Sequence, residues 1–356
     1  MKLRSITIKL LTIVFLLSCG IKSFAQQISF KSDEAEKRVD VLVNGKLFTS
    51  YCWPDNVMKP ILFPIQTSAG TIITRGYPVK PRPFETVDHP HHNGSWLNYG
   101  DLNGYNFWGN TGPNLTDTSA AVKLRNSKLG SIKHLSFEKM TGGKGEGVLI
   151  DKASWITFAG KELLAERTEY HFIAKGSILM IDRITTLTAT GEPVTFVDTK
   201  EGMFGIRVAR ELELPSQAKV SLTDANGIPS KEKVTSTEGV TGNYRSSEGI
   251  TGEDVWSTRA RWMDLYGNIG NEKISIVICD HPKNVSYPTY WHARGYGLFT
   301  LNPFGVKDFT KGKEVLNYTI PKGKSITLRY RIIVNSGSHL TDVQNNALAD
   351  EFAAKY

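Results

Sequence analysis

Three of the eight histidines of this 356-residue chain lie within four positions, at His89, His91 and His92. Imidazole titrates near neutral pH and is a common metal ligand, so such a cluster can serve acid–base chemistry or bind a metal. Trp96 and Asp101 follow closely. Clustered titratable groups beside an aromatic ring and a carboxylate favour a functional cleft over a solvated turn. We predict that His92 and His91 are catalytic and that Trp96 and Asp101 contact the substrate.

A second segment, Tyr290-Trp-His-Ala-Arg-Gly-Tyr296, repeats this chemistry near the C-terminus, and two such segments with a β-rich sequence between them predict one cleft built from distant loops. The second segment combines an aromatic platform, a proton carrier and a cation within a few residues. We predict that His292 and Tyr290 are catalytic and that Trp291 and Arg294 bind the substrate. The alternative is a strand end with the tryptophan in the core and the arginine on the surface.

A third segment, Lys200-Glu-Gly-Met-Phe-Gly-Ile-Arg207, places an arginine on an apolar strand. A charge in such a position must be paired or face a cleft. We predict that Arg207 binds a substrate carboxylate through its guanidinium fork, with Glu201 in the same site. The alternative is a structural salt bridge from Arg207 to Glu201, Glu211 or Glu213.

No cofactor is predicted. A bound metal is kept as an alternative, with His89, His91 and His281 as its ligands, because alternate residues of an extended segment share a face. A zinc ion would need a third ligand beyond the cluster, and Asp101 or His292 could also supply it. Neither an HExxH motif nor a cupin-like carboxylate pattern accompanies the histidines.

The N-terminus resembles an export signal. A basic start precedes the apolar stretch from Leu10 to Leu17, and Ser23-Phe24-Ala25 supplies the small residues of a cleavage site. We predict a signal peptide over residues 1–25 and a periplasmic or secreted protein. The alternative is lipoprotein processing at Cys19. No other segment approaches the roughly 18 apolar residues of a membrane helix.

The charge and the cysteines exclude some classes of protein. The formal charge of +8 includes four cations of the predicted leader, and no long run of Lys and Arg exists. The remaining small excess is compatible with an anionic substrate but not with a nucleic-acid footprint. Beyond the leader the only cysteines are Cys52 and Cys279. We expect both to be buried and unpaired, with a disulfide as the alternative.

The pattern along the chain is mostly of strands. Asn44-Gly45 separates two alternating runs and predicts a hairpin, and residues 147–208 form a nearly unbroken series of β-type runs with short turns. Residues 224–253 are predicted to form an extended loop, with a short hairpin as the alternative. Such meandering strands predict a mainly β fold, one large antiparallel β-sandwich over residues 26–338.

Only the C-terminus, residues 339–356, is predicted to be helical. Thr341 and Gln344 have the spacing of a capping box. The predicted apolar stripe consists of Val343, Ala347, Leu348 and Phe352.

Four motifs together resemble the PmoA-like family of exported bacterial proteins, over about residues 61–334. They are His89-Pro-His-His-x-Gly-x-Trp96, Gly100-Asp-x-Asn-Gly-x-x-Phe-Trp108, the segment from Glu201 to Ala209 and the segment from Tyr290 to Phe299. The resemblance implies a mutarotase-like supersandwich and a role in polysaccharide breakdown. It also implies a dehydratase acting on uronic-acid ends of oligosaccharides, including those of ulvan. One departure is Asn93, where relatives commonly carry Arg, so this chain is expected to bind less acidic or differently placed groups if that Arg contacts substrate.

These observations lead to a first hypothesis, a lyase that eliminates water from a terminal uronic acid. Arg207 and Arg294 would neutralise the carboxylate, His92 or His292 would take the alpha proton, and the other histidine or Tyr290 would protonate the departing hydroxyl. Two alternatives belong to other classes: a non-catalytic sugar-binding module, and a metal-dependent oxidase or hydrolase. The oligomeric state is left open.

Overall fold

The computed structural model describes residues 25–356. The predicted signal peptide, with Cys19, lies outside the described residues except for Ala25.

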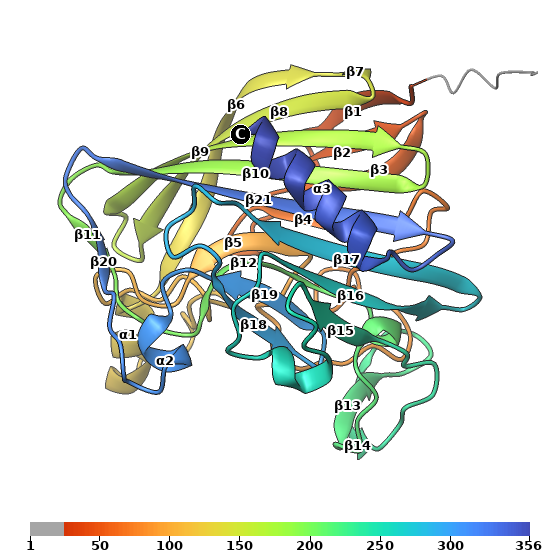
Figure 1. Cartoon of the computed structure of the whole chain (residues 1–356). Coiled ribbons are helices and arrows are strands. Elements are labelled where there is room, and N and C mark those ends of the chain that lie inside the picture. The colour runs from red at the N-terminus through yellow and green to blue at the C-terminus, as the bar shows by residue number, and fades with distance from the viewer. Residues whose placement is uncertain (1–24) are drawn as a thin grey trace, which may run out of the picture.

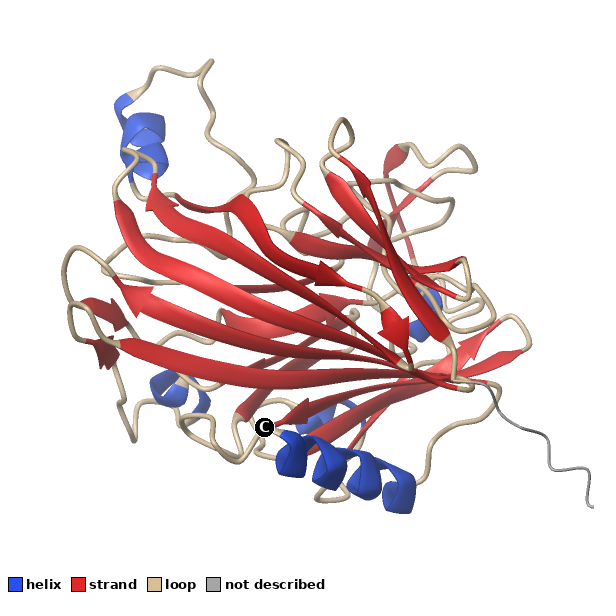
Figure 2. Cartoon of the chain, turned by 90° about the horizontal axis from the view of Figure 1, so that it is seen from above, coloured by secondary structure: helices blue, strands red, loops and turns tan. Residues whose placement is uncertain are grey.

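Two large antiparallel sheets face each other (Figures 1 and 2). The first has nine strands in the order β18-β19-β12-β5-β4-β3-β2-β1-β7. Its strands are β1 Gln27–Asp33, β2 Arg38–Val43, β3 Lys46–Cys52, β4 Ile61–Ile65, β5 Ser95–Tyr99, β7 Gly143–Lys144, β12 Gly202–Arg207, β18 Tyr290–Arg294 and β19 Leu298–Asn302. The predicted mainly β antiparallel sandwich is confirmed.

The second sheet has eight strands in the order β15-β16-β17-β21-β10-β9-β8-β6. They are β6 Gly130–Thr141, β8 Glu146–Thr157, β9 Glu162–Lys175, β10 Ile178–Ala189, β15 Asn243–Ser246, β16 Trp262–Ile269, β17 Glu272–Asp280 and β21 Ser325–Ser336. Two small pairs complete the strands, β11 Val194–Phe196 with β20 Tyr318–Ile320 and β13 Val220–Thr223 with β14 Pro229–Val234.

The main core lies between the two large sheets. Alternate residues of each strand point into it, as Val39 and Val41 do from β2 and as Leu149 does from β8, and all three are fully buried in one cluster. Asn44 and Gly45, with φ of 50° and 79°, form the predicted hairpin turn between β2 and β3. The same alternation of inward and outward side chains thus forms both sheets of the sandwich.

Three features differ from the sequence prediction. The structure contains two further helices, α1 Ala120–Ser127 and α2 Val306–Phe309. Residues 224–253, expected as an extended loop with a short hairpin as an alternative, contain β14, which forms a hairpin with β13, and β15, which pairs with β16. Ser119 caps α1 through its side chain, yet the helix buries little apart from Asn126. A short helix without an apolar stripe gives no periodic signal, which explains why it was missed.

The predicted C-terminal helix is α3 Asp342–Lys355, and the Thr341–Gln344 capping box is present. It lies across the outer face of the eight-stranded sheet (Figures 1 and 2). Its buried residues are Asn345, Ala349 and Phe352, whereas Val343 is 78% exposed. The predicted stripe was therefore wrong at Val343 and at Ala347, which is also exposed, because the helix turns Asn345 and Ala349 toward the sheet instead.

Cys52 and Cys279 are unpaired, as predicted, but only Cys279 is buried, and Cys52 is partly exposed. Within residues 25–356, no helix is long and apolar enough to cross a membrane.

Candidate functional site

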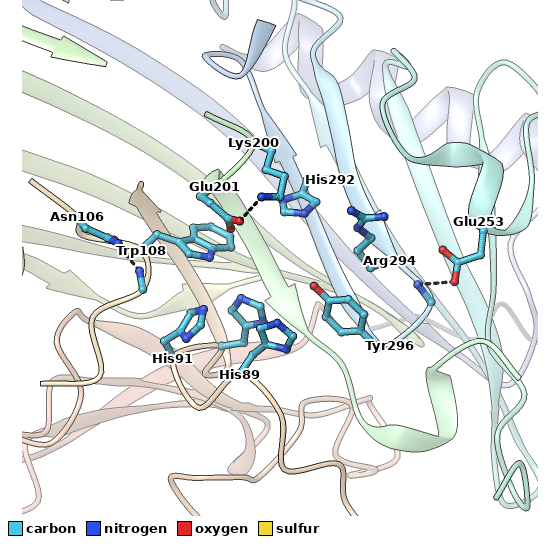
Figure 3. A pocket seen from close by; sticks show the side chains of 13 residues that line it. His89, His91, Asn106, Trp108, Lys200, Glu201, Glu253, His292, Arg294 and Tyr296 are labelled. Atoms are coloured by element: carbon cyan, nitrogen blue, oxygen red, sulfur yellow. Dashed lines mark hydrogen bonds and ion pairs between the residues drawn. The ribbon is translucent and has the colours of Figure 1, made fainter. Parts of the chain in front are cut away.

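The two histidine-bearing segments meet at one pocket of about 620 Å³ (Figure 3). His89, His91 and His92 come from the loop that precedes β5, while His292 and Arg294 come from β18. These strands lie at one end of the nine-stranded sheet, where β5 pairs with β12, β12 with β19, and β19 with β18. The loop before β5 and the strand β18 are distant in sequence, and this series of antiparallel pairs brings them to the same end of the sheet.

A carboxylate supports one of these histidines directly. Asp88 Oδ2 is hydrogen-bonded to Nδ1 of His89. Asp88 also accepts from Arg207 at 2.7 and 3.1 Å and from Arg75 at 2.9 Å. Burial alone would raise the pKa of Asp88, but His89, Arg207 and Arg75 hold it well below its ordinary value. Asp88 is therefore ionised and fixes the orientation of the His89 ring, which lines the pocket and has Nε2 as the nitrogen not bound to Asp88.

Arg207 does not reach the pocket. Its side chain is fully buried, and its two terminal nitrogens donate to Asp88, Thr86 and Glu213, the last at 3.4 Å. The prediction that Arg207 forks a substrate carboxylate was therefore wrong, and the structural pairing with Glu213 is what the fold adopts. Burial raises the pKa of Glu213 to about 7, although Arg207 opposes the rise.

Four rings stack in a column, and three of them line the pocket. Tyr296 lies 5.0 Å from His89, His89 lies 4.9 Å from His92, and His92 lies 5.5 Å from Trp96, with interplanar angles of 7°, 5° and 13°. His92 is 2% exposed, and both of its ring nitrogens are sealed from solvent without a hydrogen-bond partner. Burial, followed by the nearby His91, holds its pKa well below the ordinary value. His92 is thus placed as a packing ring, and it cannot take a proton from a bound molecule in this conformation.

The two tryptophans predicted to hold a sugar ring are both fully buried. Trp96 belongs to an apolar cluster on the outer side of the nine-stranded sheet, with Trp108 beside it at 5.6 Å. Trp291 belongs to the main core, and its Nε1 donates to the carbonyl of Ala260 at 3.1 Å. Neither offers a free ring face, so both predictions were wrong. Trp108, only 3% exposed, is the tryptophan that lines the pocket.

Strand β18 sorts its side chains by alternation. His292 and Arg294 face the pocket, whereas Trp291 faces the core. Tyr290 shares the outer face but stacks on Phe309 at 5.1 Å and does not line the pocket, so the structure does not place it for catalysis. His292 is 2% exposed, and burial lowers its pKa to about 3.

Arg294 is the cation of the pocket that has no carboxylate partner among residues 25–356 within ion-pair distance. Its guanidinium lies 4.7 Å from the ring centre of Trp256. Lys200 also lines the pocket but is paired with Glu201 at 2.9 Å. Glu253, on the Arg294 side in Figure 3, accepts from the backbone N–H of Gly295 at 3.1 Å. Arg294 is therefore the side chain best placed to bind an external anion.

Two other predicted residues lie elsewhere. Asp101 closes a turn by accepting from the N–H of Gly104 at 2.7 Å and does not line the pocket. His281 is fully buried below α3, with its ring 5.1 Å from that of Phe352. A metal site of His89, His91 and His281 is therefore wrong, because His281 lies under α3 on the outer face of the eight-stranded sheet and does not line the pocket. Across the described part of the chain, no group of three or more His, Cys, Asp or Glu side chains is arranged to hold a metal.

Sequence reasoning gave no role to Asp88, Tyr296 and Lys200, and it named Trp108 only as part of a motif. Asp88 directly precedes His89, so a carboxylate–imidazole pair was a usable signal. Tyr296 closes the Tyr290–Tyr296 segment that drew attention to His292. Its ring is half-buried, and burial raises its pKa to about 12.

Asn93 is buried and donates to the carbonyl of Pro90 at 2.9 Å. It therefore stabilises the loop and does not face the pocket, so the expectation of altered substrate contact at this position finds no support in the geometry.

Residues 38–350 match a family of unknown function, DUF6807, and the chain belongs to that family. The match does not test the resemblance to the PmoA-like family, which stays a prediction. No curated protein matches the chain.

Solved structures match only weakly. The galactosidase domain of an alpha-galactosidase–sucrose kinase, AgaSK, is 7% identical with a TM-score of 0.35, over 87% of this chain and 42% of that one. The alpha-galactosidase AgaB of Geobacillus stearothermophilus is 9% identical with a TM-score of 0.33, over 87% and 41%. The protein Slr1438 of Synechocystis sp. PCC 6803 is 10% identical with a TM-score of 0.30, over 92% and 100%. The chain thus spans less than half of the two galactosidases, and likenesses at this level carry no argument.

Proposed function

We propose that this protein is an exported carbohydrate-active lyase that eliminates water from a terminal uronic acid of an acidic oligosaccharide. The observation that carries the proposal is the Asp88–His89 pair in a pocket that also holds the unpaired Arg294. An oriented imidazole supplies a base, and an unpaired guanidinium supplies a site for a carboxylate. Elimination next to a carboxylate needs both.

The proton alpha to a carboxylate is weakly acidic, so the enzyme must stabilise the charge that develops on the carboxylate oxygens. In the proposed reaction Arg294 binds that carboxylate, with Lys200 adding positive charge nearby. Nε2 of His89 takes the alpha proton, and Asp88 stabilises the imidazolium that forms. The electrons of the broken C–H bond form the double bond as the C4–O bond breaks.

The departing hydroxyl needs a proton. Tyr296 lies against His89, lines the pocket, and keeps its proton at neutral pH because burial raises its pKa to about 12. It donates to the leaving oxygen, which departs as water, and the proton held by His89 then returns Tyr296 to its neutral form through solvent. His91 and His292, with pKa values lowered to about 3 chiefly by burial, stay neutral, and His91, the more exposed of the two, binds a sugar hydroxyl.

The test is incubation with oligosaccharides that end in a uronic acid, followed by absorbance of the conjugated uronate and by mass spectrometry. We expect a product lighter by one water, and we expect the His89→Ala protein to form none. His339→Ala is the matched control, because His339 binds the carbonyl of Gly267 outside the pocket. Full activity of a folded His89→Ala protein, or no product from the wild type with any acidic oligosaccharide, would contradict the proposal.

One observation favours a second candidate, glycoside hydrolysis. Glu201 and Glu253 both line the pocket, and paired carboxylates are the usual machinery of that reaction. The same assay separates the two, since hydrolysis adds water and shortens the oligosaccharide. Binding without any product would instead favour the sugar-binding module, and loss of activity with a chelator would favour the metal-dependent alternative.

A further inference from the structure

Every backbone carbonyl of residues 88–92 accepts a hydrogen bond from a buried side chain. Arg75 donates to the carbonyls of Asp88, His89 and His92 at 2.8, 3.0 and 3.2 Å. Lys59 donates to that of His91 at 2.7 Å, and Asn93 donates to that of Pro90. A surface loop normally leaves such groups to water, which exchanges freely. This loop is held from inside the protein.

Arg75 makes the larger share of these contacts. It is 1% exposed and also binds Oδ1 of Asp88 and the carbonyl of Thr86. The planar guanidinium has five donors in a fixed arrangement, which an ammonium cannot reproduce. His89 has a φ of 43°, in the left-handed region that non-glycine residues avoid, so its conformation persists only if neighbouring groups impose it.

Lys59 holds the same loop at a cost to the fold. It is 3% exposed, and none of the described carboxylates lies within ion-pair distance of it. Its ammonium contacts the His91 carbonyl and lies 5.2 Å from the ring centre of Trp96. Burial lowers its pKa to about 7. A buried ammonium without a counter-charge destabilises a protein, and an apolar residue of the same length would fill the space at less cost.

We propose that Arg75 and Lys59 are positioning residues of the candidate site. They hold residues 88–92 by the backbone, so that His89 faces the pocket in the orientation that Asp88 supports. The proposal rests on the proposed function, in which His89 is the base. Its first readout, however, is the hydrogen bond between Asp88 and His89, which exists without substrate.

The first experiment compares Arg75→Lys with Arg331→Lys. Arg331 is also fully buried and pairs with an aspartate, Asp182, but it lies under α3. The hydrogen-bonded imidazole proton of His89 is followed by NMR, together with Tm, kcat and KM. Arg75→Lys is expected to lose the His89 signal and to lower kcat on the order of a hundredfold with a smaller change in KM, since displacement of a reacting group by about 1 Å has that effect. Arg331→Lys is expected to lower Tm but to keep the signal and the activity.

The second experiment uses Lys59→Met, which keeps the chain length and removes the charge and the donor. We expect Tm to stay the same or rise while kcat falls roughly tenfold or more, a combination that a purely structural residue does not give. If Arg75→Lys fails to fold, the Lys59→Met variant still tests the proposal. A lowered Tm that by itself accounts for the lost activity, or an unchanged His89 signal in both folded variants, overturns the proposal. If the wild type eliminates no water, the proposed function fails, while the NMR comparison still decides the positioning role.

Discussion

Replacing Asp88 by Asn tests the centre of the site most directly. The carboxylate accepts from His89, from Arg207 twice and from Arg75. Asparagine keeps the size but has one acceptor oxygen, and its NH₂ group must face one of these donors. The substitution therefore leaves a donor unpaired and removes the negative charge between two buried guanidinium groups.

The expected loss of stability follows from this geometry. Removing one partner of a fully buried ion pair costs about 3–5 kcal/mol. The Asp88 side chain is 36% exposed, so solvent screens part of the interaction, and we expect about 2–3 kcal/mol instead. That corresponds to a fall in Tm of roughly 4–10 °C. If His89 is the base, kcat falls between about 10²-fold and 10⁴-fold, the range that a positioned acid–base group contributes.

The pH dependence supplies a further check. Because the pKa of Asp88 is lowered in the folded protein, its contribution is fully present above the ordinary carboxyl pKa of about 4 and is lost as the pH falls below it. Unfolding by urea is measured for the wild type and for Asp88→Asn between pH 3 and pH 8. The difference between the two proteins should be constant from about pH 5 upward and shrink toward pH 3.

The matched control is Asp182→Asn, which breaks the buried pair with Arg331 away from the pocket. It should lose stability and keep its activity. The reasoning is refuted if Asp88→Asn keeps wild-type turnover and Tm at neutral pH, or if its stability deficit grows as the pH falls below about 4.

Three further outcomes are expected. Arg294→Met should raise KM for an acidic oligosaccharide by about 10-fold to 100-fold, the worth of a charged hydrogen bond, with no change for a neutral one; equal effects on both would contradict its role as the carboxylate site. His292 has a pKa of about 3 when folded and an ordinary value near 6.5, so it makes stability fall as the pH falls through that window, by up to about 1.4 kcal/mol per pH unit. In His292→Phe the free energy of unfolding, measured with urea at pH 5 and pH 7, should lack this contribution to the pH dependence. Phe352→Ala should cost about 3–5 kcal/mol and Val343→Ala less than about 0.5 kcal/mol, as thermal unfolding would show, and similar losses would refute the helix orientation.

Local signals predicted the elements well. The Asn44-Gly45 turn and the Thr341–Gln344 capping box both involve residues a few positions apart, so the chain carries the whole instruction in one stretch. The helix α1 has no periodic apolar stripe, so the sequence did not predict it. In α3 the sequence predicted the helix but not its buried face. Val343 is exposed because the face that is buried depends on the sheet against which the helix packs.

The site divides in the same way. The residue types of the two histidine segments predicted a shared pocket, and the structure brings His91 and His292 together there. Side chains alternate along β18, so His292 and Arg294 face the pocket and Trp291, between the strand's outward residues, faces the core. Burial decided the rest: Arg207 lies under the loop and supports Asp88, and His92 is covered by His89.

By itself the sequence determined the strands, the terminal helix and the chemical kinds of side chain available for a site, because these depend on composition and on spacings of two to four residues. Tertiary structure alone decided that Arg75 and Arg207 bind Asp88 beside His89, that Arg294 has no carboxylate partner among residues 25–356, and that His281 lies under α3 and outside the pocket. Those outcomes depend on which strands pair and on which side chains lose their water. Both are set by contacts between residues more than a hundred positions apart.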